Sequence, residues 1–472
     1  MDFREINFGL SDAQSERMDY PNLLKDGYLN ISQVIETVNN PRYFLFLGYK
    51  GSGKSSLSEH LKLCENDYIV EQQPLTNFPF KFFDKVINSE DRTIKYKIIW
   101  RWLLCAYVLS SLCKDLKQIN EDTRQAIAIF TQLGLFPVIN ISSLLKKSST
   151  TTISATIKSL GISHSVSTEY AEADMELLTN YVKNIITSFT ETKPFLIIID
   201  ELDDILAPHG RQFENIAALI NEVKELNAYF YYNNILVKII VLCRTDMFEK
   251  LPGQNLNKIK QSNSFTFTWY REGIDSNKHS DLVNLINKRA KLTYPVINDV
   301  FKEFFPQKYN NINIYSALLD YTRHTPRDFI QLINYIQLNC DSENVTKTAI
   351  TKGIKNYSTD YFLPEISNEL SGYLPSVAIQ PVFNVISSIR SQSFTYEQFI
   401  KIYNDVYALK DIDPLYVLNI LYDCSAIGHT HYYKENNTTR VLFKYRNRST
   451  AFEKSDTILL HRGLWKAMNV DY

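Results

Sequence analysis

A cluster of glycines followed by lysine and serine is the strongest chemical signal in the sequence. Residues 48–55 read GYKGSGKS and match the phosphate-binding pattern GxxxxGK[ST]. Glycines let backbone N–H groups wrap a phosphate, and the N-terminus of a following helix adds a favourable dipole. The pattern predicts an ATP site in which Lys54 reaches the β- and γ-phosphates and Ser55 ligates Mg²⁺. The predicted nucleotide-binding residues are Gly48, Tyr49, Lys50, Gly51, Ser52, Gly53, Lys54, Ser55 and Ser56.

Two acidic residues follow a second apolar run, FLIII at 195–199. At the end of a buried strand beside a phosphate loop, Asp200 would hold Mg²⁺ and Glu201 would orient and deprotonate the attacking water. Taken alone, the same pattern also fits a strand that ends in a solvated turn. We expect Asp203 and Asp204, in the same loop, to cap a helix rather than to bind metal.

Two arginines are candidates for contacting the γ-phosphate, because the guanidinium fork can pair with phosphate bidentately. Arg244 follows the apolar run VKIIVL at 237–242, at the strand end that faces ligands in open α/β sheets. Arg327 lies in HTPRD, a helix start with Thr325 as N-cap and proline at the first helical position. The alternative for either arginine is an ordinary surface ion pair.

The elements that must position these residues are short apolar strands alternating with helices. Residues 43–47, 195–199 and 237–242 are apolar almost throughout, which is typical of strands buried on both faces of a parallel sheet. Residues 95–116 predict a long buried helix, and residues 213–231 an amphipathic one. The Ser/Thr-rich stretch 148–168 predicts an inserted loop with short strands.

The order of these elements predicts an α/β fold in which a parallel-sheet core is followed by a helical lid and a C-terminal winged helix. The predicted domains are an N-terminal helical segment (1–40), a P-loop core (41–272) with an insertion at about 77–170, a lid (273–365) and a winged-helix-like domain (366–472).

Composition restricts the class of protein. The chain has 472 residues, enough for two to four domains, and 51 basic against 52 acidic residues give a net charge of −1. Any nucleic-acid surface must therefore be local. The six cysteines are scattered without a CxxC pair, which indicates reduced thiols. No secretory signal and no apolar run of roughly 20 residues is present, so we expect a cytoplasmic protein without membrane contact.

Together these segments resemble the AAA+ ATPases, most closely the origin-recognition and initiator-like group that overlaps with signalling STAND ATPases. More narrowly, the chain is similar to a family of bacterial P-loop ATPases. The matching segments are Phe8-Gly9, GYKGSGKSSL, IIIDELDDI, LCRTDMFEKLPGQNLNKI, TRHTPRDFIQLINYIQ and LLHRGLWKA. The long interval between Lys54 and Asp200 departs from a minimal core.

The resemblance implies several roles. Arg327 would be the sensor-2 arginine of the lid, and Arg244-Thr245 would stand at sensor 1, where the family more usually has Asn, Ser or Thr. It also implies ATP hydrolysis as a conformational switch, assembly into a homo-oligomer or with an effector protein, and a place in bacterial antiphage defence.

The C-terminal sequence suggests an alternative partner. Residues 429–433 and 440–445 predict a hairpin, in whose second strand Arg440, Lys444, Arg446 and Arg448 would share one face. That face could bind duplex DNA, as in an initiator-like ATPase, or it could be a solvated wing or a protein-docking surface. A small-molecule kinase is a third hypothesis, although such enzymes need neither a lid nor an added module.

Two further groups of residues are expected to be structural. Cys424, His429 and His431 fit no standard zinc spacing, so we expect ordinary turn residues there. The aromatic run at 229–232 is expected to pack in the core at a helix end.

Overall fold

The computed structural model describes all of the chain except residues 87–90, 115–118, 163–170, 190–192, 203–209, 254, 272–277, 434, 436 and 471–472. Its residues group into two compact units. We call Ser32–Lys50 with Leu57–Phe267 the sheet unit, and Met1–Ile31 with Gly51–Ser56 and Thr268–Tyr472 the lid unit.

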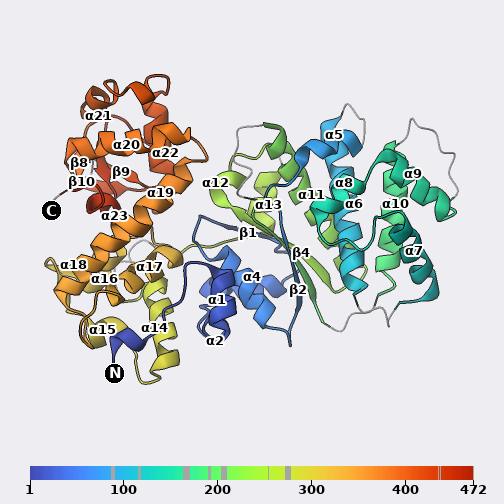
Figure 1. Cartoon of the computed structure of the whole chain (residues 1–472), viewed down its shortest axis with the longest axis horizontal. Helices are drawn as coiled ribbons and strands as arrows, with labels where there is room; N and C mark the ends of the chain where they lie inside the picture. Colours follow the sequence, from blue (N-terminus) through green and yellow to red (C-terminus); the bar gives the residue numbers. More distant parts are fainter. Residues whose placement is uncertain are drawn as a thin grey trace. The chain divides into compact units, whose positions relative to one another are not determined.

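The sheet unit is built on a five-stranded parallel sheet with the strand order β2-β3-β4-β1-β5. Figure 1 labels β1, β2 and β4 of this sheet. The strands are β1 (Leu45–Gly48), β2 (Ile69–Pro74), β3 (Phe195–Asp200), β4 (Val237–Arg244) and β5 (Ser264–Thr266). Every residue of β1 and β3 is buried, as their apolar sequences predicted. In the middle of the sheet, β4 pairs with β3 on one side and with β1 on the other, so the phosphate-loop strand is separated from β3 by one strand.

Helices cover this sheet and one another. The helix α6 (Arg92–Leu112) contacts both α10 (Ala171–Ile186) and α11 (Gly210–Tyr232), and α11 also contacts β4. Trp100 of α6 donates its indole N–H to the Asn215 side chain of α11 at 2.6 Å. Because α6 is covered from more than one side, its sequence is apolar around much of its circumference.

The remaining helices of the sheet unit are shorter. They are α3 (Val34–Asn39), α4 (Lys54–Leu63, whose first residues belong to the lid unit), α5 (Phe83–Val86), α7 (Glu121–Gln132), α8 (Ile141–Lys147), α9 (Thr150–Ser159), α12 (Thr245–Phe248) and α13 (Leu256–Asn263), with short 3₁₀ turns at Ile31–Gln33 and Phe80–Phe82. For residues 150–159, the helix α9 corrects the prediction of loop and short strands in the Ser/Thr-rich stretch 148–168, whose residues 163–168 lie outside the described part of the chain. Ser149 caps α9 by accepting from the Thr152 N–H, and Ile153 and Ile157 share its buried face.

The lid unit begins with N-terminal segments that pack on the helices after residue 280. A 3₁₀ turn (Phe3–Glu5), α1 (Ala13–Asp19) and α2 (Pro21–Asp26) open the chain. The Arg289 guanidinium donates to the Phe8 carbonyl at 2.6 Å and to the Glu16 carboxylate at 2.7 Å, and both charged side chains are buried. An unpaired charge there would be costly, so this contact fixes the N-terminal segment on α14.

A series of helices forms the middle of the lid unit. They are α14 (Asp281–Thr293), α15 (Val300–Phe304), α16 (Ile314–Leu319), α17 (Pro326–Gln337), α18 (Lys347–Asn356), a π-helical turn (Tyr357–Phe362), α19 (Leu363–Leu370) and α20 (Ser376–Ile389), with a two-stranded ribbon of β6 (Lys308–Tyr309) and β7 (Ile312–Asn313). Asp299, Thr325 and Thr346 accept backbone N–H groups at the starts of α15, α17 and α18. The predicted helical character of this region is confirmed.

The C-terminal part combines helices with a four-stranded antiparallel sheet of order β10-β9-β11-β8. Its elements are β8 (Ser393–Phe394), α21 (Tyr396–Tyr403), a 3₁₀ turn (Tyr407–Leu409), α22 (Pro414–Asp423), β9 (Ile427–Tyr433), β10 (Thr438–Leu442), β11 (Thr457–Leu460) and α23 (Arg462–Trp465). Helices followed by a hairpin are the order that the sequence predicted for a winged helix. The predicted fold class, a parallel-sheet α/β core with a helical lid and this C-terminal module, is confirmed.

The extent of the second hairpin strand differs from the prediction. Strand β10 ends at Leu442, and the chain then turns. Of the four basic residues expected on one face of that strand, Arg440 alone lies in it, and Lys444, Arg446 and Arg448 follow it. The predicted continuous cationic face is therefore wrong, because strand alternation stops before three of its four members.

Among the described helices, none combines the length and the apolar composition that crossing a bilayer requires.

Candidate functional site

The phosphate-loop segment Gly51–Ser56 packs with the lid unit. Gly51 and Gly53 have φ angles of 76° and 95°, in the left-handed region that favours glycine. The Trp269 indole N–H donates to the Ser52 carbonyl at 2.8 Å. The Ser52 hydroxyl is buried and has no hydrogen-bond partner among the described residues. A buried donor left in this state next to two such glycines fits a loop that encloses an anion.

The first turn of α17 lies directly against this loop. Its N-cap, Thr325, accepts the Asp328 backbone N–H at 3.2 Å, and Pro326 occupies the first position, as the sequence predicted. The Arg327 backbone N–H donates to the Gly51 carbonyl at 3.4 Å. A Cβ atom on Gly51 would lie 3.1 Å from the Arg327 Cβ and 3.3 Å from the Thr325 hydroxyl. The left-handed φ of Gly51 and this close approach of α17 together favour glycine at position 51.

The Arg327 side chain reaches away from its own helix toward the N-terminal segment. Its Nε donates to the Ser11 carbonyl at 3.0 Å, and its Nη1 lies 4.0 Å from a carboxylate oxygen of Glu365. The side chain is 31% exposed. The guanidinium therefore keeps N–H groups that face solvent or could face a ligand, while one contact tethers it to the chain's N-terminal segment.

The carboxyl edge of the parallel sheet gathers the second set of predicted residues, all within the sheet unit. Gly48 of β1 is the register partner of Arg244 of β4, and Pro74 of β2 is the partner of Asp200 of β3. Because parallel strands share one carboxyl edge, the start of the phosphate loop, Asp200 and Arg244 lie along the same edge. Strand order thus brings together residues that are far apart in sequence.

Asp200 and Glu201 differ in their surroundings. Asp200 is 5% exposed, and its carboxylate accepts the Gln72 amide at 3.3 Å and the Glu201 backbone N–H at 2.8 Å. Glu201 is exposed and has a φ of 59°, in the left-handed region. Its carboxylate accepts a hydrogen bond from the Thr76 hydroxyl. The structure thus presents one buried and one exposed carboxylate, with the exposed one held by the segment that follows β2.

Arg244 is held within the sheet unit by an ion pair. Its Nε and Nη2 donate to the two carboxylate oxygens of Asp246 at 3.0 and 2.7 Å, and its side chain is 9% exposed. Burial acts to raise the pKa of Asp246, but the Arg244 guanidinium outweighs burial and holds this pKa below its ordinary value. The alternative for Arg244, an ordinary ion pair, is therefore present, but the pair is partly buried rather than on the surface.

Other residues singled out from the sequence have different surroundings. Asp203 and Asp204 lie outside the described residues. In the aromatic run at the end of α11, Phe230 is buried, whereas Tyr231 and Tyr232 are 60% and 81% exposed, so the expected core packing is wrong for these two tyrosines.

The histidines of β9 share one carboxylate. His429 Nδ1 lies 2.6 Å from the Asp456 carboxylate, and His431 Nδ1 lies 3.2 Å from both of its oxygens. In the described part of the chain, no group of three His, Cys, Asp or Glu side chains is arranged to hold a metal ion.

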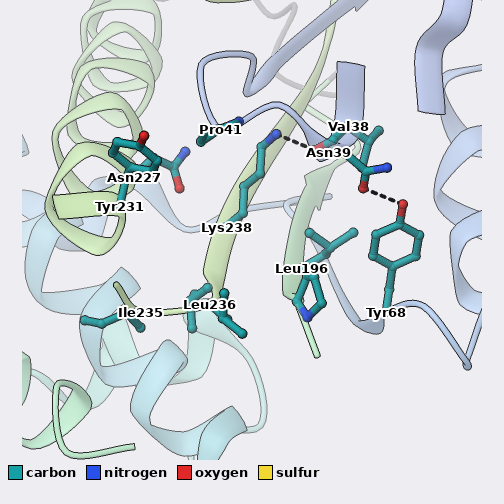
Figure 2. A pocket seen from close by; sticks show the side chains of 12 residues that line it. Val38, Asn39, Pro41, Tyr68, Leu196, Asn227, Tyr231, Ile235, Leu236 and Lys238 are labelled. Atoms are coloured by element: carbon teal, nitrogen blue, oxygen red, sulfur yellow. Dashed lines mark hydrogen bonds between the residues drawn. The ribbon is translucent and has the colours of Figure 1, made fainter. Parts of the chain in front are cut away.

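A pocket of about 230 Å³ lies at the opposite, amino-terminal edge of the parallel sheet (Figure 2). Its wall includes Leu196 of β3, Lys238 of β4 and Tyr68. The Lys238 ammonium donates to the backbone carbonyls of Val38 and Asn40 at 2.5 and 2.7 Å, and burial lowers the pKa of Lys238 to about 7. Because these carbonyls end α3, the lysine caps a helix C-terminus. Within the sheet unit, the pocket and Asp200 thus lie at opposite strand ends.

The sequence did not reveal three residues that contact the predicted site residues, namely Ser11, Thr76 and Trp269. Ser11 contributes a backbone carbonyl, which no residue type signals. Thr76 follows a strand that carries no motif. Trp269 offered one usable signal, because tryptophan is rare in this chain and this one follows the last apolar strand.

Comparisons with known proteins give two findings. A family model described as the FunZ-associated C-terminal helical domain matches residues 280–363, which is less than half of the chain. Among solved structures, Cdc6p from Pyrobaculum aerophilum is similar over 97% of this chain and 91% of that one, with 11% identity and a TM-score of 0.29. No curated protein matches the sequence.

Proposed function

We propose that this chain is an AAA+/STAND-like ATPase that binds and hydrolyses ATP with Mg²⁺ and uses the cycle as a conformational switch. The observation that carries the proposal is the contact between the phosphate loop and the start of α17. Gly51 accepts the backbone N–H of Arg327, so a phosphate-binding sequence and an arginine-bearing helix start lie in one unit. A ligand bound to the loop would therefore act directly on the start of this helix through that contact.

The loop residues suit the phosphates of a nucleotide. Gly51 and Gly53 provide the left-handed backbone that turns N–H groups toward one point, and the buried Ser52 hydroxyl has hydrogen-bonding capacity to offer. The Lys54 ammonium, 8% exposed at the first position of α4, would neutralise charge on the β- and γ-phosphates. These groups bind and orient the ligand.

Hydrolysis needs a carboxylate that binds the metal and another that activates water. Ser55 and Asp200 would hold Mg²⁺, which when bound neutralises the phosphate charge. Glu201 would accept a proton from the attacking water. In the structure the Thr76 hydroxyl donates to one of its two carboxylate oxygens, and Glu201 would exchange this hydrogen bond in order to reach the attacking water. This exchange gives the proposed cycle a resting and an active arrangement.

The roles of Arg327 and Arg244 are also part of the proposal. Arg327 would contact the γ-phosphate from the lid unit, since its guanidinium is partly exposed and its backbone is already on the phosphate loop. Arg244 would contribute from the sheet edge after loosening its pair with Asp246. Arg327 needs the smaller rearrangement of the two, because its ion pair with Glu365 is long, at 4.0 Å, whereas Arg244 pairs with Asp246 at 2.7 Å.

The test of the proposal is nucleotide binding by the Lys54→Ala variant. We expect the wild-type chain to bind ATP with Mg²⁺ in calorimetry and to release phosphate slowly, while Lys54→Ala loses binding. Lys146→Ala, which removes an exposed lysine from α8, should bind as the wild type does. Glu201→Gln should retain ATP affinity and lose hydrolysis by at least about a hundredfold. Unchanged affinity in Lys54→Ala would contradict the proposed site.

For the partner we propose a second copy of the chain or an effector protein, in bacterial antiphage defence, as the resemblance implies. A nucleotide-driven switch of this type would act by changing what it assembles with. Size measurement with ATP, with ADP and without nucleotide tests the assembly, and plaque counts with wild-type and Lys54→Ala chains test the defence role. Nucleotide-independent size and equal plaque counts would contradict it.

Duplex DNA remains the second candidate partner, favoured by the exposed Arg440 on β10. Lys444 and Arg446 support it less, since they contact Thr450 and Asp320 within the chain. Binding through about three phosphates would give a log–log salt slope of roughly −3. Duplex binding at low salt that disappears when Arg440, Lys444, Arg446 and Arg448 are neutralised would favour this candidate.

A further inference from the structure

Asp320 lies between two arginines of the C-terminal module. It is the residue at the C-terminal end of α16, immediately before the segment 321–327. Arg446, which follows β10, donates to one oxygen of the Asp320 carboxylate at 2.9 Å, and Arg462 of α23 donates to the other at 2.9 Å. Each oxygen therefore has its own charge-assisted hydrogen bond, from two separate parts of the module.

Aromatic rings continue this contact along the same segment. The rings of Tyr445 and His324 stack at 5.4 Å, and Tyr270 meets His324 edge-on at 5.1 Å. The Arg446 guanidinium lies over both tyrosine rings, at 5.2 Å from Tyr445 and 5.5 Å from Tyr270. Cation–π and stacking contacts of this kind add to the ion pair and fix the turn after β10 on the segment.

The C-terminal module makes a second contact with this segment through residues 461–465, which read HRGLW. His461 stacks on Phe362 at 4.9 Å, and the Ser358 hydroxyl donates to the Gly463 carbonyl at 2.6 Å. A Cβ atom on Gly463 would lie 2.7 Å from the Tyr321 carbonyl and 2.8 Å from the Phe362 ring. The backbone of this motif therefore approaches the segment as closely as glycine alone permits.

Buried ion pairs hold the segment on the residues that follow it. Arg323 pairs with Asp328 at 2.9 Å and with Glu369 at 2.6 Å, and all three side chains are buried. Burial acts to raise the pKa of Asp328, but Arg323 outweighs it and keeps this pKa below its ordinary value. Buried pairs of this kind break at a high free-energy cost, so the segment moves together with the residues that it pairs with.

We propose that Asp320 is a positioning residue for Arg327: by binding Arg446 and Arg462 it ties the C-terminal module to the segment that carries Arg327 onto the phosphate loop. The position of the module then sets the position of the arginine, and the nucleotide state is passed to the module through the same segment. The inference rests on the proposed function. It also assigns Arg446 and Arg462 a role within the chain, as the partners of Asp320.

The test is a double-mutant cycle on the full chain. Asp320→Asn keeps the shape of the side chain and weakens both ion pairs. We expect kcat for ATP hydrolysis to fall about tenfold with KM changed less than twofold, and Asp320→Glu to lose less. In an Arg327→Ala background, Asp320→Asn should change kcat less than twofold, because Asp320 acts through Arg327. Hydrogen exchange in segment 321–327 should lose its response to ATP.

Asp281→Asn is the matched control, because it also removes a carboxylate that pairs with an arginine, Arg271, in the same unit. It should leave kcat unchanged. If Asp320→Asn proves unstable, Arg446→Gln takes its place with the same expectation. If Asp320→Asn still lowers kcat tenfold in the Arg327→Ala background, Asp320 does not act through Arg327 and its role is only structural. If Asp320→Asn and Asp281→Asn have equal kcat, this inference is overturned while the proposed function stands. A wild-type chain without ATP hydrolysis would overturn the proposed function, and this inference with it.

Discussion

At the scale of single residues, the sequence predicts chemistry best where the chemistry is local in the chain. The glycines, Lys54 and Ser55 of the phosphate loop are neighbours, and their spacing alone predicts an anion-binding turn before a helix. Most partners of the other predicted residues lie far from them in the sequence. Arg244 pairs with Asp246, two residues on, but Glu201 is bonded to Thr76 and Arg327 to Ser11. Such partners follow from tertiary packing, which no short pattern encodes.

The Thr76–Glu201 hydrogen bond gives a prediction at this scale. Thr76→Val removes the donor and leaves a side chain of similar size, so Glu201 no longer has to exchange a bond before it activates water. We expect hydrolysis to rise about threefold to tenfold with ATP affinity unchanged, in line with the strength of a hydrogen bond to a charged group. Steady-state phosphate release measures this. Thr151→Val, at an exposed threonine of α9, is the control. A rate below that of the wild type would show that Thr76 holds Glu201 in its active position.

At the scale of elements, the starts of helices were predicted well, because a cap is defined by adjacent residues. Thr325 and Pro326 begin α17 as expected. Strand ends were predicted less well, because β10 already stops at Leu442. The turn that follows is held by other contacts: the Tyr445 N–H donates to the Ser425 hydroxyl, and Arg446 donates to Asp320. The Ser/Thr-rich stretch forms α9 because capping and two buried isoleucines outweigh weak helix propensity.

Two threonine N-caps allow a matched test of α17. Thr325 and Thr346 each accept the backbone N–H three residues on, at 3.2 and 3.1 Å. Alanine at either position should lower the free energy of unfolding by about 1 kcal/mol, measured by urea denaturation. Thr325→Ala should in addition weaken ATP binding, since this cap lies on the phosphate loop, whereas Thr346→Ala should not. Equal ATP affinity in the two variants would mean that the contact between α17 and the loop carries no binding energy.

At the scale of the whole molecule, strand alternation and the helical run that follows it predicted the fold class, because each depends on hydrophobic periodicity over long stretches. The grouping of residues into compact units could not be predicted, since it places the six residues 51–56 with the lid unit and the rest of the P-loop core as far as Phe267 with the sheet unit. The ring contacts of His324 with Tyr445 and of His461 with Phe362 likewise join segments that lie roughly a hundred residues apart in sequence.

These two histidines make the stability of the lid unit dependent on pH. Burial, with a smaller contribution from nearby arginines, lowers the pKa of His461 to about 3 and that of His324 well below its ordinary value. The folded chain therefore keeps both rings neutral while the unfolded chain binds protons below about pH 6.5. Stability is fully present above that pH and is lost as pH falls. We expect the free energy of unfolding to drop by about 2 kcal/mol per histidine between pH 7 and 5, and His324→Phe to reduce the slope. A slope unaffected by His324→Phe would contradict this assignment.

The most direct test of the central claim is a comparison of ATP and ADP affinity in the Arg327→Ala variant, measured by calorimetry with Mg²⁺. If Arg327 contacts the γ-phosphate from the lid unit, the variant should bind ADP nearly as the wild type does, bind ATP at least about tenfold more weakly, and hydrolyse it with a kcat that is much lower but still measurable. Equal losses of affinity for ADP and ATP would contradict the claim, because Arg327 would then support the fold and not distinguish the two nucleotides.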